Sequence, residues 1–292
     1  MTSNAVIPPF ILLDKLIKEW LLEDIGRGDR TTQGLISGSK EVKAKWIAKE
    51  AGVIAGLPIA KRVFQLLNQQ VNFTATVPEG QYCDLSDNQK PIIATIEGPL
   101  DALLMGERVA INLAMRLSGI ATMTRKYVDE IVDLPTQFAD TRKTTPGMRL
   151  LEKYATQVGG GVNQRMGLDD SVLIKDNHIA VAGGIGEAVT QIRSRIPYPL
   201  TIEVETETLD QVQEALKYEV DTIMLDNMPV EVMKQAVGII RGQNQRIKIE
   251  ASGNVNLKTI RATAETGVDY ISSSGPITRS TWLDLSQLII DN

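Results

Sequence analysis

Residues 201–228 read TIEVETETLDQVQEALKYEVDTIMLDNM and contain the pattern on which the architecture of the chain rests. An apolar run from Leu200 to Val204 is strand-like, Leu209 to Lys217 has helical spacing, and Thr222 to Leu225 is a second strand-like run. A helix between two short apolar strands at this spacing predicts a parallel βαβ unit.

The same alternation continues on both sides of this unit. The further expected strands are Gln137 to Asp140, Val172 to Ile174, Lys248 to Ala251 and Tyr270 to Ser272. The further expected helices are Met148 to Val158, Gly184 to Ile196, Val230 to Ile240 and Leu257 to Thr266. About six such units predict an α/β fold with an incomplete TIM-like barrel over residues 119–276.

Residues 1–118 have a different texture, with strand-like runs separated by Gly and Pro between two helical segments. The expected helices are Leu12 to Leu22 and Ala102 to Leu117, and the expected strands are Val42 to Ala48, Gly52 to Ala55, Val71 to Val77 and Ile92 to Glu97. This order predicts a small N-terminal sheet with helices on one face, an α/β sandwich that precedes the barrel.

Composition excludes several classes of function. The 292 residues carry a formal net charge of -5, which argues against a broad nucleic-acid surface. The single cysteine, Cys83, forms no intrachain disulfide, which fits a cytoplasmic protein, and we expect neither a signal peptide nor a membrane partner. The single histidine, His178, excludes zinc sites with several His ligands, so we expect any metal to be a hard cation such as Mg²⁺.

Polar side chains follow nearly every expected barrel strand. In barrels of this type the active site lies at the carboxyl ends of the strands, so these side chains are expected to share one site. They are Thr141, Arg142 and Lys143 after the first strand, Lys175 after the second, Glu205 and Asp226 on the next two, and Ser252, Gly253, Asn254, Ser273, Ser274 and Gly275 in the last two loops.

The residue types indicate an anionic substrate. Arg142, Lys143, Arg165 and Lys175 can neutralise carboxylates or a phosphate, and the Gly/Ser loops can bind phosphate through backbone N–H groups. Glu205 and Asp226 can hold ribose hydroxyls, bind a cation, or stabilise a developing positive charge. Solvated loops remain the alternative for each single position, and His178 is read as a hydrogen-bonded structural residue before a general base.

Eight segments of the chain, in order, resemble the signature motifs of quinolinate phosphoribosyltransferases. They are EDIGRGDRTT (23–32), GERVAINLAMRLSGIAT (106–122), TRKTTPGMRLLEKYATQVGGG (141–161), NQRMGLDDSVLIKDNHI (163–179), IEVET (202–206), IMLDNM (223–228), EASGNV (250–255) and TGVDYISSSGPITRS (266–280). The resemblance implies transfer of phosphoribosyl from phosphoribosyl pyrophosphate (PRPP) to quinolinate with decarboxylation. It also implies Mg²⁺ as cofactor, and residues 277–292 returning to an N-terminal domain of residues 1–118.

The resemblance also implies roles for individual residues. Catalytic roles fall to Lys143, Lys175, Glu205 and Asp226, the last two being near Mg²⁺-pyrophosphate. Substrate binding falls to Arg108, Thr141, Arg142, Gln164, Arg165 and the loops Ser252 to Asn254 and Ser273 to Gly275. Arg108 is expected to act across the interface of a homodimer or a higher oligomer.

The motifs depart from the family pattern at Gln164, where histidine is usual, and at Arg279, where histidine is common. Glutamine donates a hydrogen bond but carries no charge. Two alternatives therefore stay open: a related ribosyl- or phosphoribosyltransferase with another acceptor, such as nicotinate, and a small-anion binding protein built on a degraded enzyme.

Overall fold

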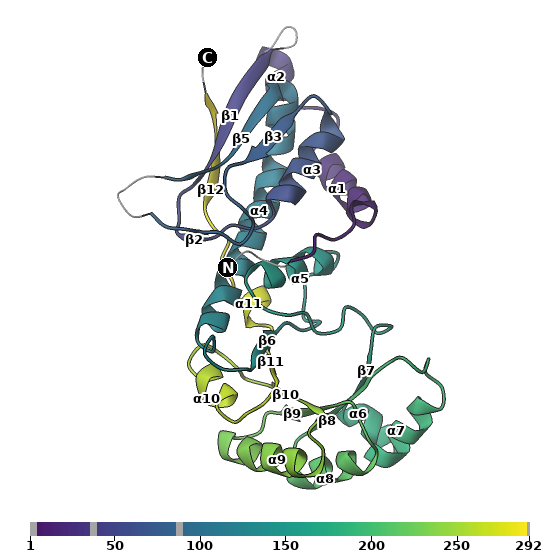
Figure 1. Ribbon diagram of the computed structural model, residues 1–292. Helices are drawn as coiled ribbons and strands as arrows, with labels where there is room; N and C mark the ends of the chain where they lie inside the picture. Colours follow the sequence, from purple (N-terminus) through teal and green to yellow (C-terminus); the bar gives the residue numbers. More distant parts are fainter. Residues whose placement is uncertain (1–4, 36–39, 86–89, 291–292) are drawn as a thin grey trace. The chain divides into compact units, whose positions relative to one another are not determined.

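The computed structural model describes residues 5–35, 40–85 and 90–290, which pack as two compact units (Figure 1). The first unit comprises residues up to 125, residues 145–160 and residues from 279 onward, and the second comprises 126–144 and 161–278. The ends of the expected N-terminal domain and of its returning segment, residues 1–4 and 291–292, lie outside the described residues.

The first unit contains a four-stranded antiparallel sheet in the order β12-β1-β5-β3. Its strands are β1 Glu41–Ala48, β3 Asn72–Ala75, β5 Ile92–Pro99 and β12 Leu285–Ile290, and β2 Gly52–Val53 pairs separately with β4 Tyr82–Cys83. The helices are α1 Phe10–Ile25, α2 Arg30–Leu35, α3 Leu57–Leu67, α4 Leu100–Asp129 and α5 Arg149–Val158.

An aromatic cluster holds this sheet against its helices. Trp46 of β1 lies edge-on to Phe64 of α3 and to Phe73 of β3, with ring centroids 6.3 and 5.4 Å apart. The Trp46 indole nitrogen also donates to Gln287 of β12 at 2.8 Å, which ties the C-terminal strand into the first sheet. The C-terminal segment thus returns to the first unit, where β12 pairs with β1 in an antiparallel register.

The second unit is a parallel sheet of six strands in the order β6-β11-β10-β9-β8-β7. Its strands are β6 Gln137–Ala139, β7 Val172–Ile174, β8 Ile202–Thr206, β9 Thr222–Asp226, β10 Lys248–Ser252 and β11 Tyr270–Ser272. The order is cyclic, and among the described residues β6 and β7 form no pair with each other. This is the incomplete α/β barrel that the sequence pattern predicts.

Helices cover the outside of the parallel strands (Figure 1). They are α6 Asp176–Ala182, α7 Ile185–Arg193, α8 Leu209–Lys217, α9 Val230–Gln243, α10 Ile260–Ala264 and α11 Gly275–Thr278, and successive helices from α6 to α10 pack side by side. Between the strands and these helices, the sheet buries aliphatic side chains such as Val204, Ile223 and Ile249, which are fully covered.

Two expectations about helices in the first half of the chain were wrong. The helix expected to end at Leu117 runs on to Asp129, because apolar residues continue at helical spacing through Ile120 and Ala121, which are fully buried. Helix α3 was missed, although Pro58 at its first turn is a typical helix-start signal. None of the described helices has the combination of length and apolar character that crossing a membrane requires.

Candidate active site

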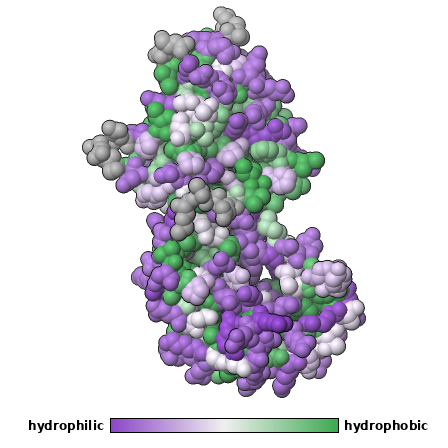
Figure 2. Space-filling view, in the orientation of Figure 1, coloured by the Kyte–Doolittle hydropathy of each residue, from purple (hydrophilic) through white to green (hydrophobic). Residues whose placement is uncertain are grey.

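A pocket of about 500 Å³ lies at the carboxyl ends of the parallel strands, and every strand of the barrel unit contributes to it. Its lining is Thr141, Arg142, Lys143, Gln164, Arg165, Leu173, Lys175, Glu205, Met224, Asp226, Asn227, Ser252, Gly253, Asn254 and Ser272. Parallel strands end at one edge of their sheet, which is why residues spread over more than 130 positions of sequence meet here. On the face shown in Figure 2, hydrophilic side chains gather over β8, β9 and β10.

The pocket unites eleven of the residues that the sequence indicated. They are Thr141, Arg142, Lys143, Gln164, Arg165, Lys175, Glu205, Asp226, Ser252, Gly253 and Asn254. Leu173, Met224 and Ser272 were not among the expected site residues, whereas Asn227 follows Asp226 at a strand end where polar groups were expected. Met224 and Ser272 were predictable in principle: Met224 lies two residues before Asp226 on the same face of β9, and Ser272 ends β11.

The last indicated loop, Ser273 to Gly275, lies outside this lining. The Ser273 hydroxyl donates to the Val255 carbonyl at 3.0 Å and accepts from the Gly275 N–H at 3.2 Å. The Ser273 N–H donates to the Ala139 carbonyl at 3.1 Å. These contacts join the ends of β6 and β11 to the loop after β10, so Ser273 shapes the edge on which the pocket is built.

Arg108 lies in the first unit, on α4. It lines a separate pocket of about 330 Å³ together with Trp20, Glu23 and Asp24. Its guanidinium is 3.8 Å from the carboxylate of Glu107, and its side chain is 62% exposed. Arg108 therefore has the exposure that contact with another molecule requires.

The four cations of the pocket are held in different ways. Arg165 donates to the Ser171 carbonyl at 2.9 Å, and Lys175 Nζ lies 2.5 Å from Glu205 Oε2. Lys143 forms no ion pair with any described residue. The Nε atoms of Arg142 and Arg165 are buried without a hydrogen-bond partner among the described residues. Buried donors of this kind are costly unless a ligand satisfies them.

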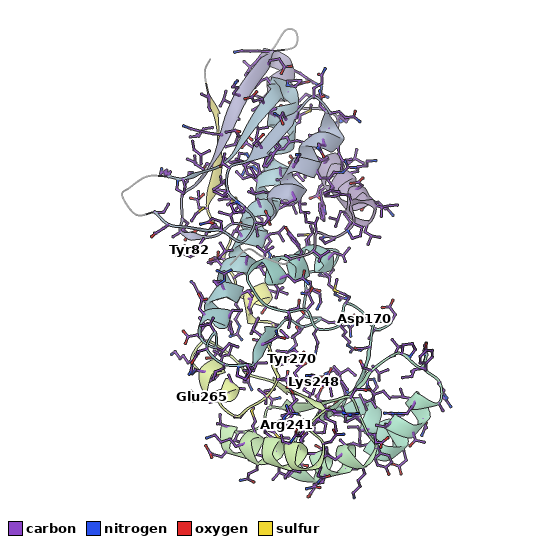
Figure 3. The ribbon with its side chains drawn as sticks, viewed as in Figure 1. Tyr82, Asp170, Arg241, Lys248, Glu265 and Tyr270 are labelled. Carbon is purple, nitrogen blue, oxygen red and sulfur yellow. The ribbon has the colours of Figure 1, made fainter. Side chains whose placement is uncertain are left out.

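Burial and the charges around Arg165 shift the pKa of its guanidinium. Burial lowers the pKa of the Arg165 guanidinium, and the like charge of Arg142 lowers it further. The nearby carboxylates Glu203 and Asp170 act in the opposite direction. Asp170 lies in the segment that leads into β7 (Figure 3) and accepts from the Met166 N–H at 2.8 Å. The pocket thus concentrates positive charge, which an anionic ligand would offset.

The acidic members of the pocket lie on the neighbouring strands β8 and β9. Glu205 is paired with Lys175, and Asp226 Oδ2 accepts from the Asn227 amide at 2.7 Å. Among the described residues, no group of three or more His, Cys, Asp or Glu side chains is arranged to hold a metal ion. A cation at Glu205 and Asp226 would therefore need other oxygen ligands to complete its coordination.

Backbone conformation is unusual in the two loops after β9 and β10. Asn227 and Asn254 have positive φ angles of 52° and 54°, and Gly253 has φ 89°. A Cβ atom on Gly253 would approach Asn227 Oδ1 and the Asn227 backbone nitrogen to within 2.2 and 2.9 Å. Strained residues of this kind cluster at binding sites, where the surrounding structure holds them. Here they bring two loops into close contact beside Asp226.

The lone histidine adopts the structural role that was favoured for it. His178 Nδ1 accepts from the Lys175 N–H at 3.0 Å, at the start of α6. It is absent from the lining of the pocket. Its contact instead fixes the backbone of Lys175 at the point where β7 ends.

Two family models match almost the whole chain. The model described as quinolinate phosphoribosyl transferase, N-terminal domain, matches residues 29–118, and the model of the C-terminal domain matches residues 120–287. A probable nicotinate-nucleotide pyrophosphorylase [carboxylating] of Synechocystis is 57% identical over 98% of this chain and 95% of its own. A relative of the same description from Bacillus subtilis is 44% identical over 89% and 87%.

Solved structures give the same result. NadC from Streptococcus pyogenes is 39% identical, with a TM-score of 0.91 over 99% of this chain and 100% of its own. The nicotinate-nucleotide pyrophosphorylase from Francisella tularensis is 36% identical, with a TM-score of 0.91 over 99% and 100%.

Proposed function

The chain belongs to the quinolinate phosphoribosyltransferase family, and from this premise we propose that the pocket of its barrel unit binds quinolinate and PRPP. The enzyme transfers the phosphoribosyl group to quinolinate with decarboxylation, which gives nicotinate mononucleotide, pyrophosphate and carbon dioxide in NAD biosynthesis. The observation that carries the proposal is a single pocket that combines four cations with two carboxylates, which lie on the adjacent strands β8 and β9.

The cations bind the anionic groups of the substrates. Arg142, Arg165, Lys143 and Lys175 neutralise the two quinolinate carboxylates and the phosphate of the sugar, and Thr141 and Gln164 add neutral hydrogen bonds. The unpartnered buried Nε atoms of both arginines support this assignment, since a dicarboxylate would satisfy them. The pKa of Arg165 supports it too: burial lowers it and the like charge of Arg142 lowers it further, and a bound anion would offset both effects.

The acids Glu205 and Asp226 stabilise the reacting sugar. The bond between the anomeric carbon and the pyrophosphate oxygen breaks, and its electron pair leaves with pyrophosphate. The lone pair of the pyridine nitrogen then forms the new bond to the anomeric carbon. Two fixed carboxylates lower the energy of the positive charge that develops on the ribose between these events. Lys143 and Lys175 orient the anions, so positioning accounts for much of the rate.

Decarboxylation follows at the carboxylate next to the ring nitrogen. The carbon–carbon bond breaks, the electron pair stays on the ring carbon beside the positively charged nitrogen, and that carbon then takes a proton from solvent. No protein base is required for this sequence, which fits a pocket without an imidazole. The apolar lining residues Leu173 and Met224 favour this step, because the departing carboxylate loses its charge as it becomes carbon dioxide.

Mg²⁺ fits the donor set of the pocket. Glu205 and Asp226 would supply oxygen ligands of the kind that Mg²⁺ prefers, directly or through Mg²⁺-pyrophosphate, and substrate oxygens and water would complete its coordination. When bound, the ion neutralises the charge of the leaving pyrophosphate. The loop Ser252 to Asn254 binds phosphate through backbone N–H groups, and the positive φ of Gly253 supports this role. The loop Ser273 to Gly275 supports the pocket edge instead, because the N–H groups of Ser273 and Gly275 already donate to the Ala139 carbonyl and the Ser273 hydroxyl.

The active enzyme is a cytoplasmic homodimer or a higher oligomer in which Arg108 of one copy completes the pocket of another. The exposed guanidinium of Arg108 supports this, as do the apolar side chains Ile11, Leu12 and Leu22, which α1 exposes in addition to its buried face. Large exposed apolar side chains grouped on one helix are typical of an interface.

Subunit complementation tests the site and the oligomer together. Arg108→Ala and Lys143→Ala should each abolish quinolinate turnover as separate proteins. Mixed subunits, refolded together, should regain activity, because a shared site pairs the intact Arg108 of one copy with the intact Lys143 of the other. Two inactive variants whose mixture stays inactive, although hybrids form, would contradict the shared site. Full activity of Lys143→Ala alone would contradict the assignment of the pocket.

A further inference from the structure

The layer of the barrel beneath the pocket is acidic. Glu203 and Glu250 lie two residues before Glu205 and Ser252 on β8 and β10, so each pair of side chains leaves its strand on the same face. Both glutamates are buried, with 8% and 4% of their surface exposed. Branched aliphatic side chains normally fill this region of a barrel, so two carboxyl groups here need a polar partner.

Gln164 of the pocket wall is that partner for Glu250. Its side-chain Nε2 donates to Glu250 Oε1 at 2.9 Å, and its backbone N–H donates to Asp140 Oδ1 at 2.9 Å. The neighbouring Asn163 donates to Asp140 Oδ2 at 2.7 Å. Asp140 is 1% exposed. Two buried carboxyl groups, one directly after β6 and one on β10, therefore fix both the backbone and the side chain of Gln164.

A carboxylate imposes one orientation on an amide. An ionised carboxyl group only accepts hydrogen bonds, so the amide nitrogen of Gln164 must face Glu250, and the amide oxygen must point elsewhere. Rotating the amide by half a turn would bring two acceptors together in a buried setting, where an unmet acceptor is costly. Glu250, which lies beneath the pocket, thus fixes the orientation of the Gln164 amide.

The groups around Glu250 shift the pKa of its carboxyl group in both directions. Burial raises the pKa of Glu250, hydrogen bonds from Ser272, Gln164 and Glu203 lower it, and the charge of Asp140 raises it. Burial raises the pKa of the adjoining Glu203, and the positive charges of Arg165 and Lys175 lower it. The hydrogen bonds to Glu250 are those an acceptor receives, which agrees with the orientation of the amide.

We propose that Glu250 is a positioning residue for substrate recognition: it accepts one N–H of the Gln164 side-chain amide and so orients the amide for the second N–H of the same nitrogen to donate to the anionic acceptor. This proposal rests on the proposed function, since it assigns a role within the same pocket. Glu250 itself does not line the pocket, and its proposed effect on the substrate passes through Gln164.

A double-mutant cycle tests this coupling. Gln164→Ala and Glu250→Ala should each raise the KM for quinolinate roughly tenfold, the effect of one hydrogen bond to a charged group, with kcat changed much less. The double variant should be no worse than the more affected single variant, because both changes remove the same contact. Additive effects on KM would overturn the proposal.

A conservative variant separates positioning from packing. Glu250→Gln keeps an oxygen that can accept from Gln164, so its KM should stay within about threefold of the wild type, well below the effect of Glu250→Ala. If Glu250→Gln is as impaired as Glu250→Ala, the acceptor is not what matters and the proposal fails. Thermal unfolding of each variant verifies the fold, and Glu231→Ala, a change at an exposed glutamate of α9, controls for the substitution itself.

Quinolinate turnover by the wild type separates a failure of the proposed function from a failure of the role of Glu250. Absence of quinolinate turnover in the wild type would overturn the proposed function and with it this role for Glu250. Normal wild-type turnover together with an additive cycle would overturn only the role of Glu250.

Discussion

The two edges of the parallel sheet carry polar residues of opposite character. At the carboxyl edge, Lys143 forms no ion pair with the described residues and buried nitrogens of Arg142 and Arg165 have no partner there. At the amino edge, Asp221 precedes β9 and accepts from the Ile202 N–H at 2.8 Å. Asp269 likewise precedes β11 and accepts from the Ile249 N–H at 2.7 Å.

The amino edge is closed by further contacts of the same kind. Arg241 of α9, labelled in Figure 3, donates to Asp269 at 2.6 Å and to the Ile247 carbonyl at 2.7 Å. Thr136 donates to the Val268 carbonyl at 2.7 Å. Polar side chains at this edge join neighbouring strands to each other. The polar side chains at the amino edge therefore stabilise the sheet, whereas those at the carboxyl edge are available to bind a ligand.

The largest expected effect follows from removing a cation at the carboxyl edge. Lys143→Ala should lower kcat/KM by about 100-fold or more, because the variant leaves a substrate anion without its counter-charge, while the melting temperature stays near the wild-type value. Lys248→Ala, at the exposed amino end of β10, is the matched control and should leave the rate unchanged. Equal losses of kcat/KM in the two variants would contradict the functional difference between the two edges.

A smaller effect is expected from Gly253→Ala. The new Cβ would collide with the backbone and side chain of Asn227, so the loops beside Asp226 must shift, and we expect the KM for PRPP to rise by roughly tenfold. Gly267→Ala is the control, because Gly267 also has positive φ but its Cβ would meet only Val237, at 3.5 Å. The control should lower stability by about 1–2 kcal/mol and leave the KM alone. Steady-state kinetics and chemical denaturation separate the two results.

At the amino edge the comparison predicts the reverse pattern. Asp269→Ala should lower the free energy of unfolding by about 1–3 kcal/mol, since Arg241 and the Ile249 N–H both lose their acceptor. Folded Asp269→Ala should keep the wild-type kcat. A fully stable variant with a collapsed rate would place catalytic function at the wrong edge.

The smallest effect belongs to the exposed ion pair between Arg261 of α10 and Asp133. The hydrogen bonds from Arg261 lower the pKa of Asp133, so the pair contributes stability above the ordinary pKa of an aspartate and loses it as the pH falls through the lowered value. Arg261→Ala should therefore lower the melting temperature slightly at neutral pH. The difference from the wild type should vanish in acid, and a difference that grew in acid would contradict the assignment.

The strands of the barrel were predictable because each is a short apolar run that ends in a polar group. The expected run Thr222 to Leu225 became β9, and Tyr270 to Ser272 became β11 without change. The short helix α6 was missed, because Asp176 to Ala182 has no buried residue and hence no apolar period. The two-residue strand β4 offers no pattern at all, since only its pairing with β2 defines it.

The site was predictable where residue type alone implied a role. Charged residues at strand ends, such as Lys175 and Asp226, can be identified as site candidates from the sequence alone. Glu250 did not, because a glutamate inside an apolar strand gives no sign that its partner is Gln164, 86 residues earlier. Contacts between strands depend on register and barrel curvature, which a linear pattern does not contain.

The central claim is that this pocket joins PRPP to a pyridine dicarboxylate. The most direct test is a coupled assay of pyrophosphate and nicotinate mononucleotide with PRPP and Mg²⁺, run with quinolinate and, in parallel, with nicotinate. The account predicts product and carbon dioxide from quinolinate and none from nicotinate. Turnover of nicotinate, or tight PRPP binding without any product from quinolinate, would contradict it.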